Sequence, residues 1–494
     1  MLYNNLKMQR MGLSYGNLDG IINSIMNMQL TDAFKKYKGK PLTYYAMNVL
    51  ILLLVLIPKE VETLFSIVPV RLLFMFALAV IFAWDYMHKS ITLNSIDLRW
   101  YLIAYGIFLL LTLPSFFSTK SIVISAYTLA KFAMIGVILF IFSKVKLEEE
   151  DFIGLIKTFV FASSIIGIYA ILQYVCDINL NPMGTDKYEI KGRVFATFFN
   201  PIYFSIFVNM VYFYLIYAYR RQVFKRPWIF ILVLMLFAGM ILSFTRSAIL
   251  VFALMLLANI ILNFRMMWNR YVLLTVALGI GLIFIIPGAL GVTGNALQYG
   301  GELVLGNGLG EFTLDIDQSE ETPDIDLSSD ASLAHRAEFA GIANQIAYDH
   351  PYTGVGFGTY INYMESEDFS SHYRDYEGSI THPHSFFVLL SAEAGYPATI
   401  AYFASLVILM LWLFITWLKS IKYKIKSAYQ LGTLSLIMIV GFIVVAYIAE
   451  NSFYDTQIST LFYIVVGLTM NYINKLQAEC PKLINKNRSS ARPA

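Results

Sequence analysis

Residues 228 to 264 read WIFILVLMLFAGMILSFTRSAILVFALMLLANIILNF, and this stretch decides the class of fold. It holds two apolar runs, residues 228 to 243 and 247 to 264, joined by a turn that contains Arg246, the one charged residue of the stretch. An apolar run of about 17 to 25 residues can cross a hydrocarbon core of roughly 30 Å as a helix, because a helix satisfies its own backbone polar groups. The stretch therefore predicts two membrane helices joined by a short turn.

The same pattern recurs along the whole chain of 494 residues. The chain is 58% hydrophobic and only 14% charged, whereas soluble proteins have roughly 25% charged residues. We therefore expect an all-α polytopic integral membrane protein with about 12 transmembrane helices, and not a protein that binds nucleic acid. The apolar runs are residues 43 to 57, 64 to 84, 100 to 117, 121 to 143, 152 to 175, 196 to 218, 228 to 243, 247 to 264, 271 to 292, 397 to 418, 428 to 449 and 456 to 474.

Lysine and arginine are distributed unevenly between the loops. The two tails and alternate loops hold 25 of the 36, and positive residues are retained on the cytoplasmic side. Both termini are therefore expected in the cytoplasm and the long polar loop outside. The expected segments are a cytoplasmic tail (1–42), nine helices (43–292), an extracytoplasmic loop domain (293–396), three helices (397–474) and a second cytoplasmic tail (475–494).

The long outer loop concentrates the polar chemistry of the chain. Between Val292 and His384 lie five of the six histidines, and sixteen carboxylates against two arginines give this loop a formal charge of −14. Residues 311 to 330 are acidic and lack periodicity, so we expect them to be flexible. Their oxygen ligands would suit calcium, but the glycine-containing spacing of a calcium loop is missing.

The second half of the outer loop has the pattern of an ordered helix. Apolar residues from Phe339 to Ile346 recur at intervals of three and four, which predicts an amphipathic helix that ends at His350 and Pro351. The glycines of GVGFG, residues 354 to 358, follow. No strand precedes them, so a nucleotide-binding loop is disfavoured. We expect them to form a tight turn that packs the loop against the bundle.

Three arginines are candidates for one anion site. Arg193 precedes the sixth run in KGRVFATFFNP, Arg246 lies in the turn SFTRS, and Arg336 opens the loop helix. A guanidinium matches phosphate oxygens with two parallel hydrogen bonds and stays charged at any relevant pH, so such a cluster would suit a diphosphate. The alternative for each is an interfacial anchor whose long side chain reaches the lipid headgroups.

His384 begins the segment HSFFVLLSAEAG, which is expected to be helical. Histidine is the usual proton acceptor near neutral pH, although a helix-start histidine can also be satisfied by backbone. His382 and His384 would form half of a zinc site, but no third ligand stands at a diagnostic spacing, so no metal is expected. Glu393 falls on the opposite helical face from His384 unless the helix breaks near Gly395. Lys131, deep in the fourth run, indicates either a functional group or a structural partner in another helix.

These segments, taken in order, resemble the O-antigen ligase and Wzy-type polymerase superfamily of bacterial membrane glycosyltransferases. The resemblance covers residues 190 to 415, and the first five runs only by hydropathy. Ser385 stands where such proteins usually have asparagine, and Ala398 where a second glycine is common. The segments are Arg193 to Pro201 with its Asn200–Pro201 pair, SFTRSA, RAEFAGIANQIAYDHPYTGVGFG and HSFFVLLSAEAG.

The resemblance implies a fold and a reaction. It implies a GT-C-like bundle in the bacterial cytoplasmic membrane that moves a glycan from an undecaprenyl diphosphate carrier, on the outer face, to an acceptor hydroxyl. No nucleotide sugar, cofactor or metal would be needed, and the displacement would be inverting. His384 would accept the proton of the acceptor, and the three arginines would stabilise the leaving diphosphate. The residues expected to support them are His382, Glu393, Asn200 and Lys131.

Several alternatives stay open from the sequence. The acceptor could be another lipid-linked repeat, the lipid A core, a protein or a Gram-positive wall polymer of the teichuronic acid kind. The long acidic loop favours a polymerase, since it could hold a growing chain. A transporter or flippase of polysaccharide intermediates should show inverted repeats and broken helices near the midplane, and the sequence has no such symmetry. A scaffold or sensor that binds wall polymer is the third possibility.

Overall fold

The protein is all helical wherever its structure is described. The structure is a computed structural model, and it describes residues 40–58, 70–176, 193–198, 200–221, 223, 229–285, 329–373, 381–448 and 451–480. No strand occurs in these ranges, although an isolated bridge pairs Leu93 with Val145. The main helices are α3 (Leu42–Leu56), α4 (Val70–Met87), α5 (Arg99–Leu111), α6 (Ile122–Lys144), α7 (Glu149–Cys176), α8 (Pro201–Arg220), α9 (Ile229–Leu242), α10 (Arg246–Leu262), α12 (Arg270–Ile285), α14 (Ser329–Asp349), α17 (Phe386–Lys422), α18 (Lys426–Ile448) and α19 (Thr456–Ala478). Shorter elements are η2 (Leu113–Phe117), α11 (Phe264–Met267), α15 (Tyr360–Met364) and α16 (Glu367–His372).

Each of the twelve apolar runs coincides with a helix. Seven helical stretches are long and apolar enough to cross a membrane, and four shorter apolar helices accompany them among the described residues. The last run forms α19, which also carries polar residues such as Thr456, Gln457 and Asn471, and these lie buried inside the protein. The protein is thus a multi-pass membrane protein, while twelve crossings stay a prediction.

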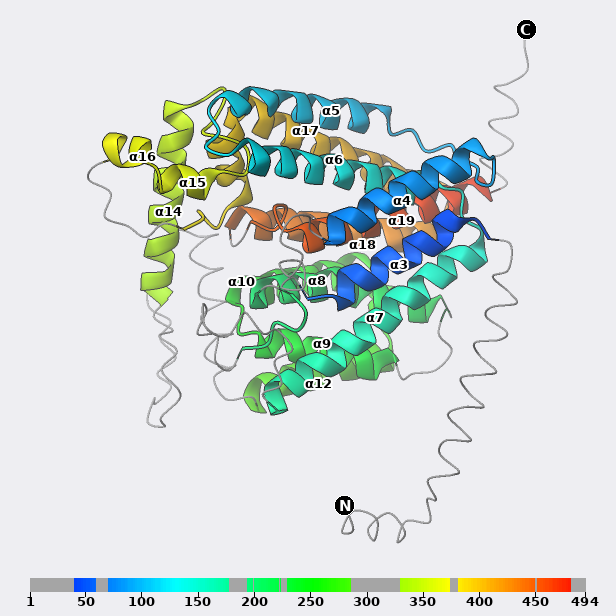
Figure 1. The fold of residues 1–494 in the computed structure, drawn as a ribbon. Coiled ribbons are helices and arrows are strands. Elements are labelled where there is room, and N and C mark those ends of the chain that lie inside the picture. The colour runs from blue at the N-terminus through cyan, green and yellow to red at the C-terminus, as the bar shows by residue number, and fades with distance from the viewer. Residues whose placement is uncertain are drawn as a thin grey trace, which may run out of the picture.

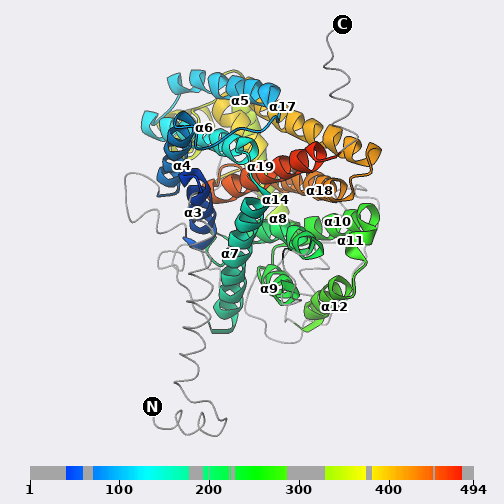
Figure 2. The ribbon, with the colours of Figure 1, turned by 90° about the vertical axis from the view of Figure 1, so that its right-hand side faces the viewer.

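The helices lie side by side in a bundle, and its two ends carry different segments of the chain (Figure 1, Figure 2). At one end α14, α15 and α16 gather. At the other end the described chain begins and α19 finishes, where Lys40 forms an ion pair with Asp151 at 2.7 Å and Lys475 with Glu149 at 3.3 Å. We call the end with α14–α16 the loop end. The predicted topology, with both tails on one side of the membrane and the outer loop on the other, stays a prediction.

Local sequence signals explain where several helices begin at the loop end. Asn200 caps α8 by accepting a hydrogen bond from Tyr203 N at 2.9 Å, and Pro201 occupies the first helical position. Asp455 caps α19 in the same way through Ile458 N at 2.8 Å. The Asn-Pro pair noted in the sequence therefore marks a helix start.

The outer loop and the tenth apolar run meet inside one element. The boundary predicted at residue 396 falls within α17, which starts at Phe386 and runs to Lys422. Gly395 interrupts this helix with a φ of 79° and a ψ of 167°. The loop helix α14 ends at Asp349, directly before His350 and Pro351 as expected, and begins earlier than its apolar pattern indicated. Of residues 311 to 330, which were expected to be flexible, 311 to 328 lie outside the described residues, whereas Ser329 and Asp330 begin α14.

Candidate functional site

Arg193 and the turn that leads into Arg246 are in contact. The Arg193 guanidinium donates from Nε to the carbonyl oxygen of Ser243 at 2.8 Å, and from Nη2 to that of Phe244 at 3.3 Å. A third contact joins Nη2 to Thr245 Oγ1 at 3.4 Å. Arg246 follows as the first residue of α10 and is partly exposed, as Arg193 is. The structure thus brings Arg193 to the turn that directly precedes Arg246, while the approach of the two guanidinium groups stays a prediction.

The segment that carries Arg193 is held by polar groups that the sequence did not single out. Gln173, 7% exposed near the end of α7, accepts from Phe195 N at 3.0 Å and from Ala196 N at 2.8 Å through the same Oε1. Thr197 Oγ1 donates to the carbonyl oxygen of Val55 at 2.6 Å. A polar residue near the end of an apolar run was the available signal for Gln173, but the sequence could not name its partners.

Strained backbone marks the three segments that carry candidate residues. Ala196, Phe244 and His384 have φ values of 50°, 49° and 50°. Residues with a side chain rarely adopt this left-handed conformation, which costs of the order of 1–3 kcal/mol and persists where the surrounding structure enforces it, often at functional sites. Lys89 and Lys424 share it at helix ends, so the strain supports the assignment of these segments only together with their contacts.

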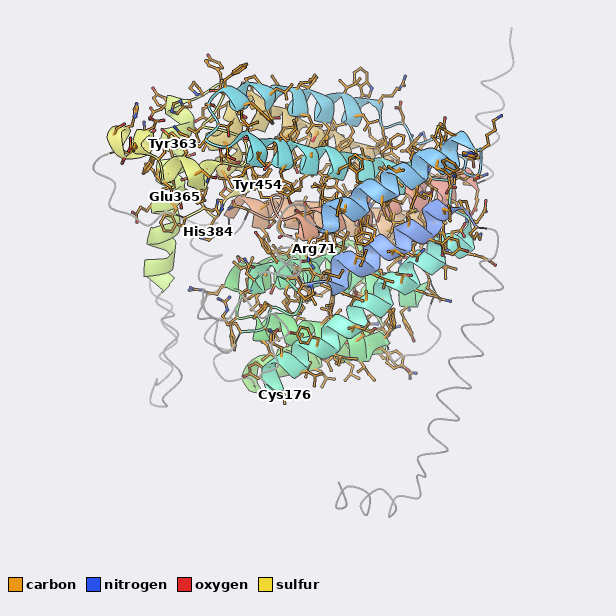
Figure 3. The ribbon with its side chains drawn as sticks, in the orientation of Figure 1. Arg71, Cys176, Tyr363, Glu365, His384 and Tyr454 are labelled. Carbon is orange, nitrogen blue, oxygen red and sulfur yellow. The ribbon has the colours of Figure 1, made fainter. Side chains whose placement is uncertain are left out.

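His384 lies at the loop end, two residues before the first turn of α17 (Figure 3). It is partly exposed, and its ring lies 6.3 Å from the ring of Phe339 on α14, measured between centroids. His382 is exposed beside the ring of Tyr360, also at 6.3 Å. Within the described residues no three His, Cys, Asp or Glu side chains gather as metal ligands would, so the zinc alternative gains no third ligand there.

The glycine turn GVGFG packs the loop against the bundle as predicted. Its three glycines have φ values of 61°, 121° and 83°. Val355 N donates to the carbonyl oxygen of Ala392 at 2.9 Å, and Ser118 Oγ donates to that of Gly354 at 2.8 Å. A Cβ on Gly354 would collide with the backbone of Glu393, so only glycine permits this approach. The turn is therefore a fixed part of the seam between loop and bundle.

Glu393 and Lys131 belong to one buried group beneath this turn. Glu393 is 1% exposed and Lys131 is 5% exposed. The helix is continuous from Phe386 to Ala394, so the break at Gly395 comes after Glu393 and does not turn it toward His384. Glu393 instead meets the glycine turn and Tyr454, and Lys131 Nζ donates to the carbonyl oxygen of Tyr454 at 2.7 Å. The structural alternative for Lys131, a partner in another segment, is thus supported.

The two remaining candidates are Asn200 and Arg336. Asn200 is occupied as the cap of α8. Arg336 lies in the first half of α14, and its side chain lies outside the described residues. The sequence grouped Arg336 with Arg193 and Arg246 and gave Asn200 as a supporting residue, and both assignments stay predictions.

An exposed ion pair fastens the loop to the bundle. Lys120, just before α6, contacts Asp368 on α16. The hydrogen bond from Lys120 lowers the pKa of the Asp368 carboxyl. Nearby, Tyr373 OH donates to Asp349 Oδ2 at 2.7 Å, which ties the end of α16 to the end of α14. The loop helices are thus joined to one another and to α6.

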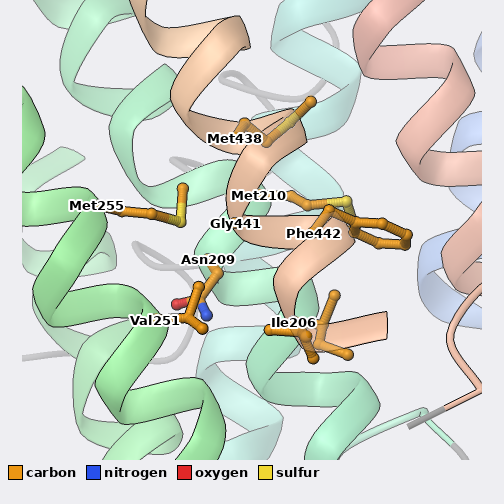
Figure 4. A pocket seen from close by; sticks show the side chains of 9 residues that line it. Ile206, Asn209, Met210, Val251, Met255, Met438, Gly441 and Phe442 are labelled. Carbon is orange, nitrogen blue, oxygen red and sulfur yellow. The ribbon is translucent and has the colours of Figure 1, made fainter. Parts of the chain in front are cut away.

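A small cavity lies elsewhere, between α8, α10 and α18 (Figure 4). Its one polar side chain, Asn209, donates to the carbonyl oxygen of Ala248 at 3.1 Å. No candidate residue lines it. The lining residues are Ile206, Asn209, Met210, Val251, Met255, Met438, Gly441, Phe442 and Val445.

The fold and the site define a multi-pass membrane protein with strained, polar segments gathered at one end of its bundle. Comparison with protein families then shows what part of this chain is similar to. The O-antigen ligase family model matches residues 230–403, which include Arg246, the glycine turn and His384. This part of the chain is similar to the O-antigen ligase family, and the resemblance seen in the sequence is confirmed there. No curated protein matches the chain.

Proposed function

We propose that this protein is a glycosyltransferase that moves a glycan from an undecaprenyl diphosphate carrier to an acceptor hydroxyl, on the outer face of the bacterial cytoplasmic membrane. The acceptor we propose is another lipid-linked repeat, so that the product is a longer surface polysaccharide. The observation that carries the proposal is the contact between Arg193 and the turn of Arg246, inside or next to the matched O-antigen ligase domain.

The arginines account for the leaving group. Cleavage of the bond between the anomeric carbon and the phosphate oxygen releases a lipid diphosphate, whose negative charge grows as the bond breaks. Arg193 and Arg246 would stabilise this charge, and Arg193 also holds the turn in which Arg246 begins α10. Arg336 would add a third positive charge from α14.

His384 accounts for the nucleophile. The acceptor oxygen forms the new bond to the anomeric carbon while its proton passes to a ring nitrogen of His384. Attack opposite the leaving diphosphate inverts the configuration at that carbon. His384 is partly exposed, which a group that touches substrate requires. No metal or cofactor is needed for this balance of bonds and protons.

Transfer assays with purified protein test the proposal. We expect the protein to elongate a lipid-diphosphate-linked repeat, and His384→Ala to lower the rate by about 10²- to 10⁴-fold, the usual contribution of a general base. Arg246→Ala should lower it by about 10²-fold or more, as the loss of a charge-stabilising donor does. His372→Ala and Arg99→Ala, on exposed residues, are matched controls that should keep full activity.

Two results would refute these assignments. Full activity of both His384→Ala and Arg246→Ala would remove the proposed roles. A wild-type protein that translocates the lipid-linked repeat across vesicles without transferring it would instead favour the flippase.

A further inference from the structure

Glu393 connects three segments that are distant in the chain. Its Oε2 accepts a hydrogen bond from Gly358 N at 2.8 Å, and its Oε1 accepts from Tyr360 N at 3.1 Å. The hydroxyl of Tyr454, in the connection between α18 and α19, donates to Oε2 as well. One carboxylate on α17 thus holds the end of the glycine turn and the start of α19 together.

Lys131 completes the group from the other side of Tyr454. Its ammonium donates to the Tyr454 carbonyl oxygen at 2.7 Å and lies 5.0 Å from the centre of the Tyr454 ring. Tyr454 therefore stands between a buried cation and a buried carboxylate. Charges in a protein interior are stable only when they are paired and hydrogen-bonded, so each of these groups depends on the others.

The glycine turn connects the group to the packing of α14 against α17. The glycine turn follows α14 after residues 350–353, and its Val355 N and Gly356 N donate to the carbonyl oxygens of Ala392 and Glu393 at 2.9 Å and 3.0 Å. At the other end of the same contact, Phe339 of α14 faces His384. A shift of the glycine turn along α17 would thus change the surroundings of His384.

We propose that Glu393 is a positioning residue for glycan transfer, which fixes the glycine turn and thereby the wall that α14 builds beside His384. This inference rests on the proposed function. Glu393 does not carry the proton itself, because a side chain that is 1% exposed does not reach an acceptor hydroxyl. Tyr454 and Lys131 act through Glu393 in the same way.

Kinetics of matched variants test the proposal. Glu393→Gln keeps one oxygen that can accept a hydrogen bond but loses the charge, so we expect the turn to shift and kcat to fall by about 10-fold or more, since a misplacement of 1 Å can cost about 10²-fold. KM for the lipid-linked donor should stay within about twofold, because the arginines are untouched. Glu365→Gln, on an exposed glutamate of the same loop (Figure 3), should match the wild type.

A double substitution tests the electrostatic part. Lys131→Met leaves the Glu393 charge buried without its cation, and Glu393→Gln added to it removes that charge. We therefore expect the double variant to recover part of the kcat lost in Lys131→Met. A double variant whose loss equals the product of the two single losses would overturn the coupling.

Hydrogen exchange separates this inference from the proposed function. Exchange of the Gly358 and Tyr360 amides should speed up in Glu393→Gln and in Tyr454→Phe, while exchange in α19 beyond its first turn stays slow. The positioning role is overturned if Glu393→Gln keeps the wild-type kcat per folded molecule, whether or not the yield of folded protein falls. If the wild-type protein transfers no glycan while its Gly358 and Tyr360 amides exchange slowly, the result would count against the proposed function. The hydrogen bonds of Glu393 to the glycine turn would still be established.

Discussion

Gly395 interrupts α17 in a backbone conformation that is open essentially to glycine alone, with φ at 79° and ψ at 167°. Replacing it with alanine adds a Cβ that would lie 2.6 Å from the carbonyl carbon of Tyr352 and 2.8 Å from the carbonyl oxygen of Pro351. Both contacts are with backbone, so no side chain can rotate away to relieve them. The loop must separate from α17, or α17 must straighten.

The structure sets the size of the effect. The conformation alone costs about 1–3 kcal/mol for a residue with a Cβ. Separation also breaks the hydrogen bond from Tyr396 N to Pro351 O, 2.9 Å long, and such a bond contributes about 0.5–1.5 kcal/mol of net stability. Alanine reduces the freedom of the unfolded chain, which returns about 0.4–1 kcal/mol. We expect Gly395→Ala to lower the free energy of unfolding by about 0.5–4 kcal/mol in all.

Unfolding of the detergent-solubilised protein by denaturant measures this difference, with Gly341→Ala as the control. Gly341 lies inside α14 with open space around its Cα, so alanine there should raise the stability by about 0.5–1 kcal/mol. Gly395→Ala should also lower glycan transfer, because the glycine turn beside the break loses its support. A Gly395→Ala protein as stable as the Gly341→Ala protein would refute the argument from backbone geometry.

Three further predictions concern single contacts. Ser385 precedes α17, but its hydroxyl has no hydrogen-bond partner among the described residues. Ser385→Ala should therefore change the free energy of unfolding by less than about 0.5 kcal/mol. Asp455→Ala removes a formed cap of α19 and should lower the free energy of unfolding by about 1 kcal/mol or more. Gln173→Leu leaves two buried N–H groups without their acceptor, so it should lower the free energy of unfolding by about 2 kcal/mol or more and reduce glycan transfer. Gln173→Glu keeps an acceptor for both hydrogen bonds. Equal losses of stability in the two variants would contradict this role of Gln173. Lys120 lowers the pKa of Asp368, so the ion pair contributes its full stability above the ordinary aspartate pKa of about 4 and loses it as pH falls through the lowered value. Hydrogen exchange in α16 should therefore rise at acid pH in the wild type. In Asp368→Asn it should be high at every pH.

The sequence predicted the helices well because their signals are local. Apolar length fixes a helix in a membrane, and the Asn200–Pro201 and His350–Pro351 pairs mark a start and an end that the structure has. The glycine turn was also predicted, since three glycines in five residues leave few other conformations. Each of these inferences needs only residues that are close in the chain.

The contacts of the candidate site were predicted only in part, because they join distant segments. The sequence indicated that Arg193 and Arg246 could converge; the structure shows Arg193 in contact with the turn before Arg246, and a shared anion site stays a prediction. It did not indicate Gln173 or Tyr454, since a glutamine or tyrosine within an apolar chain has no spacing that names its partner. The polar run of residues 451 to 455 between two apolar runs was the one available signal for Tyr454.

Exposure separates residues that the sequence had to group together. His384, Arg193 and Arg246 are partly exposed at the loop end, whereas Glu393 and Lys131 are almost fully buried and bound to backbone and to Tyr454. A group that exchanges a proton with a substrate, or faces its phosphates, must keep accessible surface, while a buried charge must find fixed partners. Under the proposed function, the charged residues therefore divide into those that would contact a lipid-linked glycan and those that would hold the loop in position. The division between exposed and buried groups also explains why the break in α17 follows Glu393. A break before Glu393 would separate the buried group of Glu393, Lys131 and Tyr454 from the helix that begins beside His384.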